Sequence, residues 1–185
     1  EMCIRDSLYT TFDKRNEPFI YTNSQEVDFD GCKMLFVPWI CDDNYEHSMN
    51  MLRTSTAEIV MGHLEIKGVE MQNGVINEHG NEKADFKRFE RVISGHFHKH
   101  SDDGQIFYCG AQYEMTWSDY KDPKAFHIFD TETREIKRIP NTRTIHKKII
   151  YDDKKHDYNN FDLTPYNDHF VKLIVLQKTN DEVFD

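Results

Sequence analysis

The sequence lacks the signatures of several common kinds of protein. Its 4 cysteines include no CxxC pair, which argues against a zinc knuckle or a disulfide framework and favours reduced thiols. No apolar run approaches the length of a membrane span, and the N-terminus has no charged and then apolar leader. Glycine-rich phosphate loops with a lysine and GxSxG motifs are also absent. We therefore expect a soluble cytoplasmic protein, in which any catalysis runs through metal.

Basic residues are in the minority, since 23 lysines and arginines stand against 33 aspartates and glutamates, for a formal net charge of -10. This balance argues against a broadly basic nucleic-acid surface, but metal cations can supply positive charge at a single site. The segment from Arg134 to Lys155 inverts the balance. Two interpretations are open: an edge strand protected by lysines, or a strip that contacts phosphates beside an active site.

Two histidines one residue apart follow the short apolar run from Arg91 to Ser94. If a strand continued through them, His96 and His98 would point to the same face, with Phe97 toward the core. Gly95 would let the backbone bend so that the imidazoles emerge at the strand end. Imidazole suits borderline transition metals, which need ligands from more than one segment. The pair is therefore a candidate for part of a metal site.

A second apolar run ends in the same way, since Ala57 to His63 closes on glycine and histidine. The order of strand, loop, helix and strand predicts an α/β layer architecture, in which ligands gather at strand ends. We expect His63 to lie beside His96 and His98, although such spacing also occurs without metal. Lys99 and His100 are candidate phosphate contacts just past the strand, and His100 is also a candidate to hydrogen-bond a residue that binds the metal. The histidines expected to be surface or packing residues are His47, His79, His127, His146, His156 and His169.

The other predicted elements come from apolar periodicity and turn residues. In chain order they are a buried strand at Lys33–Ile40, a helix at Tyr45–Thr56, a lid or short hairpin at Val69–Gly74, a helix at Glu82–Glu90 that buries Phe86 and Phe89, a turn at Asp102–Gly104 before a strand at Gln105–Cys109, strands at Ala125–Asp130 and Glu135–Ile139, and a strand at Val171–Leu176. The half after the double histidine is expected to be mostly antiparallel, and the last strand to lack a partner within the chain.

Two short motifs and an ordered set of longer segments carry a family resemblance. Gly62-His63 and Gly95-His96-Phe97-His98 are similar to the GH and GHxH motifs, the last two motifs of the calcineurin-like metallophosphoesterases. The longer segments resemble the SbcD-like double-strand-break repair nucleases, most closely those of T-even-like tailed bacteriophages. They are Phe36–Trp39, Gly62–Gly68, Ser94–His98, Trp117–Asp119, Asp122–Phe126 and Phe129–Thr133. The resemblance covers nearly the whole chain after Ser7.

The resemblance implies a fold and a domain organisation. The fold would be part of a four-layer α/β/β/α metallophosphoesterase sandwich with the start of a small α+β cap domain. Residues 8–150 would be the C-terminal half of the nuclease domain, and residues 151–185 an incomplete DNA-recognition cap. Residues 1–7 share no periodicity with the residues after them and would be a non-native remnant.

The resemblance also implies an activity. His63 and His96 would hold one divalent ion and His98 a second, usually manganese, and the two ions would hydrolyse a DNA phosphodiester. Lys99 and His100 would contact substrate. The family works as a homodimer with an SMC-like ATPase subunit and without a membrane, and a phage-encoded member would act in the host cytoplasm.

The family's first motifs have no counterpart in the sequence. These motifs, DxH, GDxxD and GNHD, supply the remaining metal ligands and the general-acid histidine, so no catalytic residue is assigned to this chain. We therefore expect an inactive fragment that lacks its N-terminal motifs. Two alternatives keep the same fold: a phosphoesterase for small substrates, or a metal-free scaffold.

Overall fold

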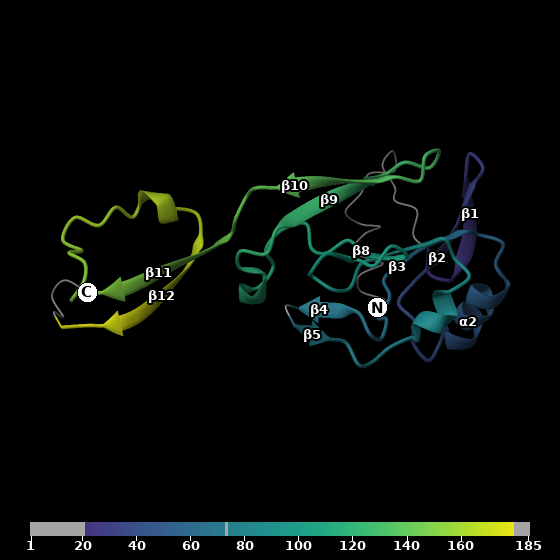
Figure 1. The fold of residues 1–185 in the computed structure, drawn as a ribbon, viewed down its shortest axis with the longest axis horizontal. Coiled ribbons are helices and arrows are strands. Elements are labelled where there is room, and N and C mark those ends of the chain that lie inside the picture. Colours follow the sequence, from purple (N-terminus) through teal and green to yellow (C-terminus); the bar gives the residue numbers. More distant parts are fainter. Residues whose placement is uncertain (1–20, 73, 180–185) are drawn as a thin grey trace.

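The computed structural model describes residues 21–72 and 74–179 of the 185-residue chain. The predicted remnant at residues 1–7 lies outside them. A body built on a six-stranded sheet occupies one end of the molecule, and a pair of strands near the C-terminus extends from it (Figure 1). No helix in the described part of the chain is both long and apolar enough to cross a membrane.

The central sheet is mixed, with parallel strands in the middle and antiparallel strands at both edges. In spatial order its strands are β1 (Gln25–Phe29), β2 (Cys32–Val37), β3 (Ile59–Gly62), β6 (Arg91–Ser94), β8 (Ile106–Tyr108) and β7 (Ser101–Asp102). The run from β2 to β8 is parallel, and β1 and β7 are antiparallel to their neighbours. Val37, Gly62 and Ser94 are in register, so three adjacent strands end together at one edge.

One face of the sheet is covered by helical segments. The helix α2 (Tyr45–Thr54) ends two residues before the predicted end and contributes Met49 and Leu52 to the core. The short helix η1 (Lys83–Phe86) comes further along the chain. The core on this face has the alternate residues of β2, β3, β6 and β8, and its sheet members are Leu35, Val37, Val60, Val92, Ile106 and Tyr108.

The opposite face is covered by a β-hairpin. β9 (Lys124–Phe129) and β10 (Ile136–Asn141) pair in antiparallel register. They confirm the two strands predicted on either side of Thr131–Thr133. Phe129 and Ile136 pack on a second cluster, which contains Cys32, Met34, Ile59, Ile93 and Phe107. Helix, sheet and hairpin thus form successive layers, in agreement with the α/β class. The complete four-layer sandwich stays a prediction.

The segment from Val69 forms a small hairpin of β4 (Glu70–Gln72) and β5 (Val75–Ile76), one of the two forms expected for it. The predicted helix at Glu82–Glu90 is wrong in type and length, because only η1 forms. Its hydrogen bonds join residues three apart, as in Phe89 N–H to Phe86 O at 3.0 Å. A repeat of three aligns Phe86 and Phe89 on one side, and both are buried as predicted.

The sheet after the double histidine is less antiparallel than expected, because β8 pairs with β6 in parallel register. β7 and β8 do pair in antiparallel fashion around the predicted turn at Asp102–Gly104. The Lys33–Ile40 prediction is confirmed by β2, which ends one residue before Pro38. Proline has no N–H to donate to a sheet, so its place just past the strand end is the expected one.

The C-terminal strand pair consists of β11 (His146–Asp152) and β12 (Phe170–Gln177), joined through the short helix η3 (Thr164–Tyr166). The predicted strand is confirmed, but the prediction that it lacks a partner within the chain is wrong, since β11 pairs with it in parallel register. An edge strand was one of the two interpretations of the basic segment that contains β11, but its pairing with the last strand was not predicted. The proposed domain boundary after residue 150 falls within β11, and the division into domains stays a prediction.

Candidate functional site

Three aromatic side chains meet where the parallel strands end. Trp39 follows β2, His63 follows β3 and His96 follows β6. The rings of His63 and His96 are 5.3 Å apart in an edge-to-face arrangement, and the Trp39 ring lies 4.9 Å from that of His96. The expectation that His63 lies beside His96 is confirmed. Side chains gather at this edge because parallel strands present their carboxyl ends together.

Two glycines permit this close approach. A Cβ at Gly62 would stand 2.4 Å from the backbone oxygen of Val37, and one at Gly95 would stand 3.1 Å from Nδ1 of His63. The first contact is impossible for a side chain, and the second would push His63 aside. Gly62 is therefore required for the close approach of the strand ends, and Gly95 lets the His63 ring lie against β6 without a shift.

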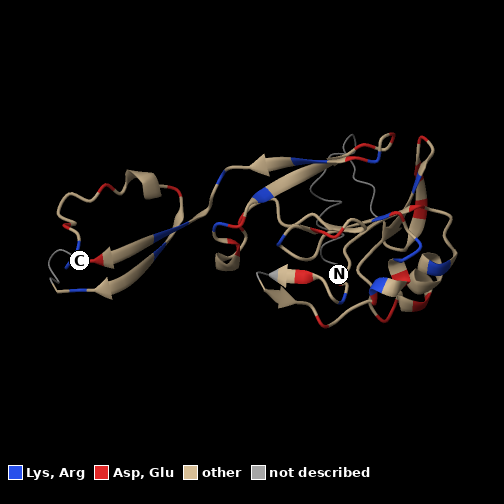
Figure 2. Ribbon diagram, in the orientation of Figure 1, with Lys and Arg blue, Asp and Glu red and all other residues tan. Residues whose placement is uncertain are grey.

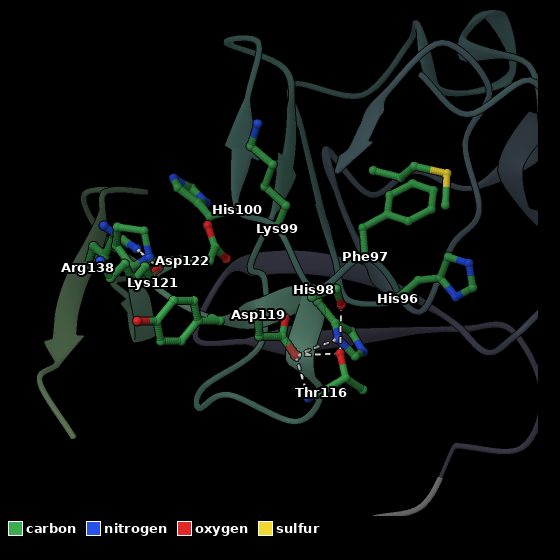
Figure 3. Close-up of a pocket in the computed structure, with 14 residues that line it drawn as sticks. His96, Phe97, His98, Lys99, His100, Thr116, Asp119, Lys121, Asp122 and Arg138 are labelled. Atoms are coloured by element: carbon green, nitrogen blue, oxygen red, sulfur yellow. Dashed lines mark hydrogen bonds and ion pairs between the residues drawn. The ribbon is translucent and has the colours of Figure 1, made fainter. Parts of the chain in front are cut away.

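His98 does not lie with the other two histidines. β6 ends at Ser94, and His96 adopts a φ of +82°, a left-handed conformation that interrupts the alternation of side chains. Phe97 is buried, as predicted, and the ring of His98 turns toward Asp119 and Thr116 while that of His96 points away (Figure 3). The prediction that His96 and His98 point together is wrong because the strand does not continue through them.

His98 contacts a buried pair of charges. Its Nδ1 is 3.3 Å from Oδ2 of Asp119, which lies in the short helix η2 (Trp117–Asp119). Oδ1 of Asp119 accepts a hydrogen bond from Nζ of Lys124 at 2.8 Å, and the side chains of both residues are 3% exposed. Burial alone would raise the pKa of Asp119, but the hydrogen bonds from Lys124 and from the Thr116 N–H outweigh it and hold the pKa well below its usual range. Asp119 is therefore ionised at neutral pH.

The predicted phosphate contacts line the same cavity. Lys99 Nζ is paired with Glu70 Oε1 on β4 at 2.7 Å, and His100 Nδ1 donates to the backbone oxygen of Tyr108 at 2.7 Å. The cavity lies between the double histidine and η2, and its lining includes Met71, His96, His98, Lys99, His100 and Arg138. Both candidates thus face a hollow that His96 and His98 also reach.

The described residues fit a divalent metal in part. The pKa of the His63 imidazole is lowered, first by loss of solvent and second by the neighbouring His96, so its ring is neutral and can donate a lone pair. The contact of His98 with a carboxylate is typical of histidines that bind metals. However, no group of three or more histidine, cysteine, aspartate or glutamate side chains within residues 21–72 and 74–179 is arranged to hold a metal ion. A complete donor set is therefore not assembled by these residues.

The basic segment from Arg134 to Lys155 has more than one role. Arg134 forms ion pairs with Glu58 and Glu90 on the body, and Arg138 reaches the cavity lining. Lys147 and Lys148 lie on β11, where Figure 2 shows basic positions continuing onto the C-terminal strand pair. Lys147 and Lys148 therefore fit the edge-strand interpretation, since β11 belongs to a two-stranded sheet, and phosphate contact by this segment stays a prediction.

Sequence reasoning missed Asp119 and Lys124 as part of the site. Both lie within segments that carried the resemblance, yet no role followed from their residue types. Thr116 and Asp119 form a capping box, in which the Thr116 side chain and the Asp119 carboxylate each bond the other's backbone. The T-x-x-D spacing is a recognisable signal for such a turn. That the turn lies against His98 is a matter of tertiary structure.

No family model matches the sequence. The chain is similar to exonuclease subunit 1 of Enterobacteria phage T4, with 38% identity over 143 residues. The matched region is 77% of this chain and 42% of that protein, so the chain spans less than half of its relative's length. This similarity supports a relationship to the phage nucleases.

Proposed function

We propose that the chain is part of a metal-dependent nuclease subunit of a phage recombination and repair complex, of the SbcD-like metallophosphoesterase type. One observation carries the proposal: His63 and His96 meet at the ends of adjacent parallel strands in a chain similar to a phage exonuclease subunit. The substrate would be DNA. The partners would be a second copy of the subunit and an SMC-like ATPase, in the host cytoplasm.

The histidines have distinct roles in this proposal. His63 and His96 would hold one of two divalent ions, manganese by the family resemblance, and His98 would hold the other. Bound ions of this kind activate water and stabilise a leaving oxygen. The chain's own residues would orient the phosphate: Lys99 and His100 line the same cavity as His98, and their N–H groups suit phosphate oxygens.

The three imidazoles form only part of the ligand set in this proposal. Carboxylates are the ligands that favour manganese over softer ions, and none lies with His63 and His96 in the described residues. The other ligands would come from the part of the subunit that corresponds to the unmatched 58% of the phage T4 relative, since the chain matches 42% of it. The 185-residue chain alone would then bind metal weakly and cleave DNA negligibly.

The experiment compares this chain with the product of the longest reading frame that contains it. Both proteins are incubated with linear duplex DNA and Mn²⁺, with and without chelator. We expect chelator-sensitive degradation by the longer protein only, abolished by His63→Gln and retained by His156→Gln, since His156 is an exposed histidine outside the site.

Three results would contradict parts of the proposal. Robust degradation by the 185-residue chain would refute the incomplete ligand set. Hydrolysis by the longer protein of small phosphoesters but not of DNA would favour a phosphatase. Absence of Mn²⁺ binding by the longer protein in calorimetry would favour a scaffold.

A further inference from the structure

One ring nitrogen of His98 already has a partner. Nδ1 lies 3.3 Å from Oδ2 of Asp119, while the His98 side chain is 40% exposed and belongs to the lining of the cavity. The ring is thus held at one nitrogen, on the side that faces Asp119 (Figure 3). Whether Asp119 accepts or donates the hydrogen bond to Nδ1 decides which nitrogen of the neutral His98 ring carries the proton.

The Asp119 carboxylate is fixed from several directions. Its Oδ2 accepts hydrogen bonds from the N–H of Met115 at 3.0 Å, the N–H of Thr116 at 2.8 Å and Oγ1 of Thr116 at 3.2 Å. Its Oδ1 accepts from Nζ of Lys124 at 2.8 Å. A carboxylate in this setting only accepts hydrogen bonds, so Nδ1 of His98 must be the donor. The lone pair of the neutral ring is then on Nε2.

Lys124 holds the backbone of the same histidine. Its Nζ donates to the backbone oxygen of His98 at 3.0 Å, and the N–H of Ala111 donates to that oxygen at 2.9 Å. Asp122 Oδ2, at 2.7 Å, is the second carboxylate on Lys124. Asp119 therefore fixes the ring of His98, and its partner Lys124 fixes the main chain from which the ring projects.

We propose that Asp119, held by Lys124, is a positioning residue that keeps His98 in the Nδ1–H tautomer and presents Nε2 to the cavity as an electron-pair donor. The inference deepens the proposed function and rests on it for the identity of what Nε2 binds, a divalent metal ion. A histidine that donates one N–H to a carboxylate is oriented and made more basic for a metal at the other nitrogen. A purely structural ion pair between Asp119 and Lys124 would leave the tautomer of His98 free.

The test determines the tautomer directly. Long-range ¹H–¹⁵N spectra of the histidine rings are recorded on the ¹⁵N-labelled 185-residue chain at about pH 8, where an ordinary imidazole is neutral. We expect the Nδ1–H form of His98 in the unaltered chain and a shift toward the Nε2–H form in Asp119→Asn. His100 donates from Nδ1 to the Tyr108 carbonyl and serves as an internal reference in every spectrum.

Asp122→Asn is the matched control. It removes a carboxylate that also contacts Lys124, at 2.7 Å, but that makes no hydrogen bond to His98 among the described contacts. The same loss of negative charge should therefore leave the His98 tautomer unchanged. Equal shifts in Asp119→Asn and Asp122→Asn would overturn the assignment, because they would indicate a general loosening of the loop.

A second measurement follows Zn²⁺ added to the same proteins. We expect Asp119→Asn to weaken the Zn²⁺-dependent change at His98 by about 10- to 100-fold in apparent Kd, and Asp122→Asn to change it less than about twofold. An Nε2–H tautomer of His98 in the unaltered chain overturns the proposal whether or not the variants fold. A tautomer that shifts as expected, with no Zn²⁺ response at His98 even in the product of the longer reading frame, supports the positioning role and counts against the proposed function.

Discussion

The central sheet and the C-terminal strand pair differ sharply in burial. β2 has six residues, of which four are buried, Phe36 is partly buried and only Lys33 is exposed. β12 has eight residues and none is buried, and its apolar Phe170 is 68% exposed. The sheet of the body is enclosed between helices and a hairpin, whereas the β11–β12 pair has only a two-stranded sheet and a few contacts to the η2 loop.

The candidate site draws its residues from the well-packed sheet and from the loop that connects it to the strand pair. The histidines stand on the edge of the well-packed sheet, and Asp119 lies in the loop that also touches β11. In that loop the carboxylate of Glu114 accepts the backbone N–H groups of Ile145 and His146 at 2.7 and 2.8 Å. Trp117 packs on His146, with ring centroids 4.6 Å apart. The body is therefore expected to hold its structure without the strand pair, and the strand pair to depend on the loop.

The largest expected effect is a difference in the free energy of unfolding lost when one phenylalanine ring is removed from each region. Phe86→Ala removes a fully buried ring from the body and should lower the free energy of unfolding by about 3–5 kcal/mol. Phe170→Ala removes the same ring from β12, where it is mostly exposed, and should cost less than about 0.5 kcal/mol. Urea denaturation measures both. Equal losses would erase the distinction between the two regions.

A smaller effect on stability is expected from the hydrogen bonds of one buried hydroxyl group within the body. The Tyr108 hydroxyl donates to Leu64 O at 2.9 Å and accepts from the N–H of Ile66 at 3.1 Å, and burial raises the pKa of Tyr108 above its ordinary value. Tyr108→Phe leaves both backbone groups without this partner and should cost about 1–3 kcal/mol. Tyr113→Phe is the control, since Tyr113 is 48% exposed. A cost for Tyr108→Phe no larger than the control's would show that the hydroxyl is dispensable.

The smallest effect concerns the loop that joins the strand pair to the body. Burial by itself would raise the pKa of Glu114, but the N–H groups of His146, Ile145 and Lys121 outweigh it and lower the pKa below 4.5. A carboxyl group whose pKa is lowered by folding binds protons less readily in the folded state. Its stabilising contribution is therefore present above about pH 4.5 and is lost as the pH falls through the folded-state value.

Glu114→Gln removes this titration while keeping an oxygen acceptor. We expect it to cost about 1 kcal/mol at neutral pH, and the difference from the unaltered chain to shrink as the pH falls below about 4.5. Hydrogen exchange should show the loss first in the amides of β11 and β12 rather than in β3 and β6. A difference that is independent of pH, or that is spread evenly over the body, would contradict the assigned role.

The local elements of the body could be predicted from the sequence where one physical signal dominated. The apolar run before Pro38 predicted β2, the Asp102–Gly104 turn predicted the β7–β8 hairpin, and the repeated glycine and histidine predicted that His63 and His96 meet. These features depend on periodicity, turn chemistry and the shared edge of parallel strands. Each is encoded within a short stretch of residues.

Features set by tertiary structure could not be predicted in this way. The parallel pairing of β11 with β12 joins residues at least 24 positions apart in the sequence, such as His146 and Phe170, and nothing in either stretch specifies its partner. The direction of His98 depends on the left-handed backbone at His96, a conformation that residue type does not indicate. Asp119 reaches His98 only because the η2 loop folds back over the strand end.

The central claim is that His63, His96 and His98 are metal ligands, and the most direct test is a Mn²⁺ titration of the ¹⁵N-labelled 185-residue chain followed at its 10 histidine rings. Paramagnetic broadening falls steeply with distance from the ion, so it reports the nearest rings even when binding is weak. We predict that the signals of His63, His96 and His98 broaden at the lowest Mn²⁺ concentration, while those of His47 and His156 stay sharp. Even broadening of all ten rings, or broadening that begins at His156, would contradict the account.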